Sequence, residues 1–137
     1  MQINLWAVIL SALASLVIGF IWYGPLFGKA WMKVAGMDNI TPEMREMMKK
    51  KMAGMLFLQA VLSTITAYVL ALFMNMTGAP SIATAFWVWF GFVMTIIGGA
   101  ALWSGKTPKL AWMMFFIMSG CQLVTFLAYG GIITAFN

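Results

Sequence analysis

Three long stretches of the chain carry no charged side chain, and the segments between them carry every charge. Residues 1–28, 52–105 and 110–137 contain no Asp, Glu, Lys or Arg. A transmembrane helix needs about 20 predominantly apolar residues to cross a hydrocarbon core of roughly 30 Å. Each outer stretch therefore holds one span. The middle stretch holds two spans, separated by the turn-forming residues 75–81.

This pattern predicts an all-α, polytopic membrane protein: one domain, residues 1–137, folded as a bundle of four transmembrane helices. We expect spans near residues 3–23, 52–74, 82–104 and 110–134, with residues 24–51 as the first connection. The second helix is expected to start earlier than its apolar part, at Pro42, because Thr41 is a good N-cap and proline suits the first helical position.

The composition supports the same class of protein. Hydrophobic residues make up 64% of the chain and charged residues 8%, whereas ordinary soluble domains are roughly 45–50% apolar and about 25% charged. A small soluble domain leaves much of its surface wet and has nowhere to bury such a sequence. A water-soluble enzyme, a disordered tail and a disulfide-built secreted module are excluded.

The basic residues predict how the helices are threaded. Six of the eight Lys and Arg residues lie in the first connection, and the other two, Lys106 and Lys109, lie in the third. Because Lys and Arg accumulate on the cytoplasmic side, we expect connections 24–51 and 105–109 to be cytoplasmic and both termini to be outside. The expected location is the bacterial cytoplasmic (inner) membrane. Residues 1–28 lack a basic leader, so we expect the first helix to be retained.

The segment after the first span predicts a bend and a short interfacial helix. Pro25 biases Gly24 away from helical geometry, which is expected to end the span there. Residues 26–35 are then expected to lie along the membrane surface until Gly36 stops them. In this helix Phe27 and Trp31 would point inward, and two lysines toward water.

Small residues recur on two helix faces. Helices in lipid associate by close backbone approach at such residues. We interpret both stripes as packing seams of the bundle, with a self-association surface as the alternative. The expected helix-packing residues are Ala7, Ser11, Ser15 and Gly19 on the first helix and Gly91, Thr95, Gly98 and Gly99 on the third.

Polar residues within the spans are few and neutral. An amide without a partner is costly in hydrocarbon, so the two glutamines are expected to face the interior. The polar set is interpreted as an interhelical hydrogen-bond cluster, with the lining of a substrate cavity as the alternative. Its members are Gln59, Ser63, Thr66, Ser119, Gln122, Thr125 and Tyr129.

Groups that carry chemistry are absent from the spans. No ionisable Asp, Glu, Lys, Arg or His lies in them, and the chain has no His at all. Proton relays usually need such a group, and no base is available to activate a Ser or Cys. We therefore expect no catalytic residue, no cofactor and no metal site. The methionines between 44 and 55 favour a flexible apolar face, toward neighbouring helices or a partner, over a Cu(I) site.

Tryptophans and lysines gather near the predicted cytoplasmic boundary. Tryptophan favours the membrane interface because its ring is apolar and its N–H seeks a polar partner. Belt anchoring explains most of these residues, and a site for an anionic lipid headgroup is the functional alternative. The candidate headgroup-binding residues are Lys29, Trp31, Lys33, Lys106, Lys109 and Trp112.

The run from Trp22 to Met32, with Gly19 upstream, carries a family resemblance. The sequence Trp-Tyr-Gly-Pro-Leu-Phe-Gly-Lys-Ala-Trp-Met resembles the signature that closes the first helix in a family of small bacterial four-helix membrane proteins, domain of unknown function 1761. The resemblance implies a multi-pass membrane protein without an established activity. It brings no catalytic residues with it.

Three functions from different classes remain. The first is a non-enzymatic structural or accessory membrane protein that acts through its helix faces. The second is a small carrier or pore for a neutral or lipophilic substrate, and the third is a protein that binds anionic lipid. The expected partners are membrane lipids and either a second copy of the chain or another membrane protein. A nucleic-acid partner is not expected.

Overall fold

The computed structural model describes residues 2–137, and all regular structure in that range is helical. The helices are α1 (Leu5–Ile21), α2 (Gly28–Val34), α3 (Pro42–Thr77), α4 (Ile82–Val88), α5 (Met94–Leu102) and α6 (Pro108–Ala135). Two π-helical turns, Trp22–Leu26 and Trp89–Val93, continue α1 and join α4 to α5.

Four helical segments are long and apolar enough to cross a membrane, which confirms the all-α, four-helix prediction. They are Leu5–Leu26, Pro42–Thr77, Ile82–Leu102 and Pro108–Ala135. The second of them begins at Pro42, as the sequence predicts, and the Thr41 hydroxyl accepts the N–H of Met44 at 3.3 Å. At 1.5 Å per residue its 36 residues measure about 54 Å, well beyond the hydrocarbon thickness.

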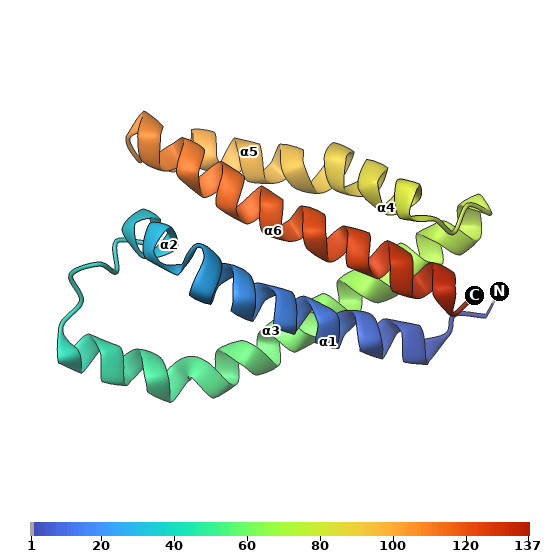
Figure 1. Ribbon diagram of the computed structural model, residues 1–137, viewed down its shortest axis with the longest axis horizontal. Helices are drawn as coiled ribbons and strands as arrows, with labels where there is room; N and C mark the ends of the chain where they lie inside the picture. Colours follow the sequence, from blue (N-terminus) through green and yellow to red (C-terminus); the bar gives the residue numbers. More distant parts are fainter. Residues whose placement is uncertain (1) are drawn as a thin grey trace.

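Helix α6 occupies the centre of the bundle. It contacts α1, α2, α4 and α5, whereas α3 packs mainly on α1 (Figure 1). The start of α1, the end of α6 and the turn before α4 lie at one end of the bundle, which we call the terminal end. There the Asn4 side chain donates to the Phe136 carbonyl at 3.2 Å. The opposite end, called the charged end, holds α2, the start of α3 and the connection before α6.

The hydrophobic core lies toward the terminal end. Its buried cluster draws on α1, α3, α4 and α6 and includes Val8, Leu70, Met74, Trp89 and Tyr129. Glycine allows the close approach of α4 and α6, because a Cβ added at Gly130 would lie 2.8 Å from the Ala85 Cβ and 3.0 Å from the Ile82 Cα. Close backbone contact of this kind is what holds helices together in lipid.

The expectation that Pro25 ends the first span at Gly24 is wrong. The chain passes both residues in a π-helical turn, and the N–H of Phe27 donates to the Trp22 carbonyl at 2.9 Å. A π turn pairs residues five apart. It therefore carries the helix past a proline that has no N–H to offer.

The short helix that follows, α2, is confirmed, but its inward face differs from the prediction. Val34 is its buried residue. Phe27 remains exposed beside Trp22, and Trp31 is half-buried against Tyr23. The helix ends as expected, because Gly36 takes the left-handed backbone conformation with φ of 69°.

The expected seam along the third span is also wrong in part. Gly91, Thr95 and Gly99 are exposed, and a Cβ added at either glycine would meet nothing within 4 Å. Gly91 lies inside the π-helical turn Trp89–Val93, which shifts the helical register. A regular spacing of four residues therefore no longer marks one packing face.

The face of α5 that packs inward is instead marked by residues three and four apart. Met94 packs against the core cluster, and Ala101 is buried. Between them, a Cβ added at Gly98 would lie 3.5 Å from the Phe115 ring. On the first helix, Ala7 and Ser11 are buried, while Ser15 and Gly19 are half-buried. Close packing of α1 is thus concentrated in its first half.

Candidate functional site

The six candidate headgroup residues all lie at the charged end, but they form two separate groups. Lys29, Trp31 and Lys33 lie on α2. The other three lie in the connection between α5 and α6 and in the first turns of α6. All four lysines of this set are exposed. Only Lys106 and Trp112 line a common hollow.

That hollow is a groove of about 460 Å³ between the end of α5 and the start of α6. Its size falls within the roughly 300–1,000 Å³ typical of small-molecule sites. Lys106 is its one charged residue, and the remaining lining is apolar. The lining residues are Gly98, Ala101, Leu102, Lys106, Pro108, Ala111, Trp112 and Phe115.

The charge around this groove is uncompensated. The three acidic residues of the chain, Asp38, Glu43 and Glu46, all belong to the first connection and the start of α3. Within residues 2–137 the ion pair is the exposed one between Glu46 and Lys49, at 3.7 Å. An exposed pair of this kind contributes about 0.3–0.5 kcal/mol at most. Lys106 and Lys109 therefore present a positive surface.

The polar interior residues are placed unevenly. Ser63, Ser119, Thr125 and Tyr129 are buried, and Thr66 and Gln122 are half-buried. The hydroxyls bond mainly to their own helices: Ser119 donates to the Phe115 carbonyl at 2.6 Å and Thr125 to the Cys121 carbonyl at 2.8 Å. Tyr129, on α6, is buried within the core cluster that α6 shares with α1 and α3.

Gln59 does not face the interior, contrary to the prediction. It is exposed, and its amide donates to the Ser63 hydroxyl at 3.3 Å, one turn along the same helix. The reason is the course of α3, which is buried against its neighbours only from Ser63 onward. The buried members of the polar set therefore pack within the bundle, and the set as a whole does not line one continuous cavity.

Sequence reasoning missed two tryptophans that tie helices to α6. The Trp22 indole N–H donates to the Ile117 carbonyl at 2.8 Å, and the Trp89 indole N–H donates to the Ser119 carbonyl at 3.0 Å. The sequence indicated only the general role of tryptophan as an anchor at the membrane interface. Each of the two tryptophans lies in a π-helical turn, and a sequence offers no reliable signal for such a turn. Gly120 in the fourth span makes room for the Trp22 ring, because a Cβ there would lie 2.9 Å from it. This glycine is the one feature of the sequence that indicates a close contact at that position.

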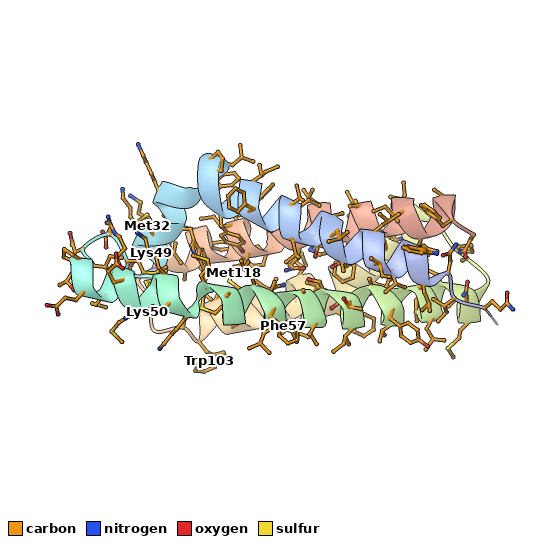
Figure 2. The ribbon with its side chains drawn as sticks, turned by 90° about the horizontal axis from the view of Figure 1, so that it is seen from below. Met32, Lys49, Lys50, Phe57, Trp103 and Met118 are labelled. Atoms are coloured by element: carbon orange, nitrogen blue, oxygen red, sulfur yellow. The ribbon has the colours of Figure 1, made fainter. Side chains whose placement is uncertain are left out.

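The first half of α3 is largely separate from the other helices of the described chain. Every residue from 49 to 59 is exposed, and Phe57 is 68% exposed. Figure 2 shows Lys49, Lys50 and Phe57 along this length of α3. Most of the methionine face expected here is exposed as well. Met44, Met47, Met52 and Met55 are exposed, and Met48 is half-buried. Of the two roles predicted for these methionines, contact with neighbouring helices is therefore wrong for the four exposed ones.

Other hollows and clusters add little chemistry. A second hollow of about 250 Å³ lies between the end of α3 and α4, and the hydroxyls of its two threonines, Thr77 and Thr84, already donate to backbone carbonyls. Among residues 2–137 there is no group of three His, Cys, Asp or Glu side chains that could hold a metal ion.

The comparisons with known proteins place the chain in one family. Residues 6–134 match the model of a family described as a protein of unknown function, DUF1761. No curated protein matches the chain, and neither does any solved structure. The family match covers both π-helical turns, the groove and the free half of α3.

Proposed function

The chain belongs to the DUF1761 family, and we propose that it is a non-enzymatic membrane component that acts through helix–helix contacts with a second copy of itself. The observation that carries this proposal is the exposed first half of α3. In a bundle of four spans, each helix normally gains its packing from its neighbours. Residues 49–59 are instead all exposed.

The chemistry of this segment suits a protein contact. Methionine is unbranched and flexible, so it fills irregular gaps and recurs at adaptable binding surfaces. Met52 and Met55 are followed by the exposed large residues Leu56, Phe57 and Leu58. A helix from another chain can pack against these residues by van der Waals contact, which is the main source of helix association in lipid.

A second surface on the same chain favours self-association over other partners. The stripe of Gly91, Thr95 and Gly99 is exposed, and a Cβ added at either glycine would meet nothing within 4 Å. Thr95 and Gly99 lie on α5, the helix that leads to the charged end (Figure 1). The free half of α3 leads to the same end. One chain therefore offers both a bulky flexible face and a small-residue stripe, the two kinds of surface that a contact between copies can use.

The orientation is part of the proposal. Lys and Arg concentrate at the charged end, and the positive-inside rule assigns that end to the cytoplasm of a bacterial inner membrane. Maleimide labelling of a cysteine placed at Ser81, in a Cys121→Ala background, is then expected from the outside only. Labelling from the inside alone would reverse the threading.

Self-association is tested by native mass spectrometry from a mild detergent together with a cysteine scan. In the Cys121→Ala background, a cysteine at each of positions 52–58 is combined with Thr95→Cys on the exposed stripe and oxidised in membranes, and Phe20→Cys on the exposed face of α1, combined with Thr95→Cys, is the control. We expect dimers, and crosslinks between copies that recur every three to four positions along α3. A monomer in both measurements, or crosslinking at position 20 as strong as on α3, contradicts the proposal.

A further inference from the structure

The groove between α5 and α6 is a separate feature from the free half of α3. It is the place where a hollow and an uncompensated charge meet, because Lys106 lines it and the acidic residues all lie in another part of the chain. Its residues take no part in the proposed contact between copies. Gly98 lies next to Gly99 of the stripe in that contact, but the stripe residues themselves do not line the groove.

We propose that this groove binds one anionic phospholipid of the surrounding bilayer, with an acyl chain along the apolar lining and the headgroup at Lys106. The acyl chain has the right surface to lie against. Phe115 and the small residues Gly98 and Ala111 line the groove, and no polar side chain other than Lys106 contributes to it. A soluble polar ligand finds nothing there to bind.

The groove is open on the side from which a lipid arrives. Leu102 is 77% exposed and Trp112 is 61% exposed, so the walls of the groove face outward from the bundle. Trp112 is stacked on Phe116 with ring centroids 5.7 Å apart, which holds a broad aromatic surface at that wall. An acyl chain enters such a groove sideways from the bilayer without passing through the protein.

The preference for an anionic headgroup follows from charge. Lys106 is exposed at the end of the groove, and Lys109 follows in the first turn of α6. The Thr107 side chain does not cap that helix, so its first N–H groups add a partial positive charge beside the lysines. A lysine near an anionic membrane surface contributes on the order of a fivefold change in binding.

The same reasoning does not extend to α2. Lys29 and Lys33 are exposed as well and lie on α2, at the same end of the bundle, but they line neither of the two hollows described above. They attract anionic lipids in general without selecting one. Lys33 therefore serves as a matched control for Lys106.

The test measures the binding of two lipids with identical tails, dioleoylphosphatidylglycerol and dioleoylphosphatidylcholine, to the purified protein by native mass spectrometry. We expect the first retained lipid to favour phosphatidylglycerol. Lys106→Gln is expected to lower the ratio of phosphatidylglycerol to phosphatidylcholine about fivefold, and Lys33→Gln to leave it unchanged. Equal losses in the two variants would show a diffuse positive surface and overturn the proposal.

The acyl-chain half of the proposal is tested by filling the groove. Ala111→Leu is expected to reduce the binding of both lipids, whereas Ala100→Leu, at an exposed position of α5 outside the groove, is expected to change neither. Gly98→Ala is a milder second variant for use if Ala111→Leu fails to fold, because its Cβ meets the Phe115 ring at an ordinary 3.5 Å. Unchanged lipid binding in a folded groove-filling variant overturns the proposal.

Discussion

The two halves of the bundle are built differently, although every span contributes to both. At the terminal end, α1, α3, α4 and α6 share one buried cluster in which Ala67, Met74 and Ala85 have no exposed surface. Toward the charged end α3 leaves the other helices, and residues 49–59 are exposed on every side. The same helix is a core element in one half and a free element in the other.

The difference follows the size of the facing side chains. Where helices meet closely, small residues such as Ser11 on α1 and Ala67 on α3 are fully buried, and backbones approach. Toward the charged end the contacts involve larger side chains, because Trp22, in the π-helical turn after α1, lies against Gly120 of α6, and Phe115 of α6 lies against Gly98 of α5. Both candidate interaction surfaces, the free half of α3 and the lysine groove, lie in this loosely packed half.

The largest expected effect compares two leucines on α3. Leu70 is 3% exposed and Leu56 is 52% exposed. Leu70→Ala is expected to lower the free energy of unfolding by about 2–3 kcal/mol, toward the low end of the range for buried leucines, because in lipid mainly the packing contribution is lost. Leu56→Ala is expected to change it by less than about 0.5 kcal/mol. Unfolding in SDS of the protein at monomeric concentration measures both.

Equal losses at the two leucines would show that the free half of α3 is packed in the folded protein. A loss at Leu56→Ala that appears only at concentrations where copies associate would instead support the proposed contact between copies. The concentration dependence therefore separates folding of the chain from its association.

The next effect compares two glycines in α6 and α5. Gly130→Ala places a Cβ 2.8 Å from the Ala85 Cβ, so α4 and α6 must separate, and we expect a loss of about 1–3 kcal/mol. Gly99→Ala meets nothing within 4 Å, and the higher helix propensity of Ala is expected to raise stability by up to about 1 kcal/mol. Thermal melting in detergent compares the two variants. A loss at Gly99→Ala similar to that at Gly130→Ala would show that the stripe on α5 is also a packed seam.

The number and order of the spans were predictable from the sequence because they depend on charge and hydropathy alone. The uncharged stretches and the cap at Thr41 place all four spans, and Pro42 fixes the start of α3. The π-helical turns were not predictable. They depend on tertiary contacts such as the hydrogen bonds of Trp22 and Trp89 to the α6 backbone, so any face counted across them by regular spacing is displaced.

The candidate surfaces were predictable only as types of residue. The sequence indicates that lysine and tryptophan gather at one boundary, but it does not indicate that Lys106 and Trp112 border a groove while Lys29 and Trp31 do not. Likewise Gln59 was expected inside because amides avoid lipid. Whether α3 contacts the other helices at the position of Gln59 depends on how those helices pack, and the sequence does not indicate this.

The smallest expected effect concerns the packing of the bundle at the terminal end. Ser11 is fully buried, and within residues 2–137 its hydroxyl has no hydrogen-bond partner. The small size of Ser11 allows α1 to pack closely against its neighbours, and alanine keeps that size. Ser11→Ala is therefore expected to raise the free energy of unfolding by about 0.5–1 kcal/mol, because it removes a buried hydroxyl that has no partner. Ser119→Ala, which removes a 2.6 Å hydrogen bond, is expected to lower it by a similar amount in the same SDS titration. A loss at Ser11→Ala would mean that a polar partner reaches this serine, and the terminal half would then depend on a hydrogen bond as well as on shape.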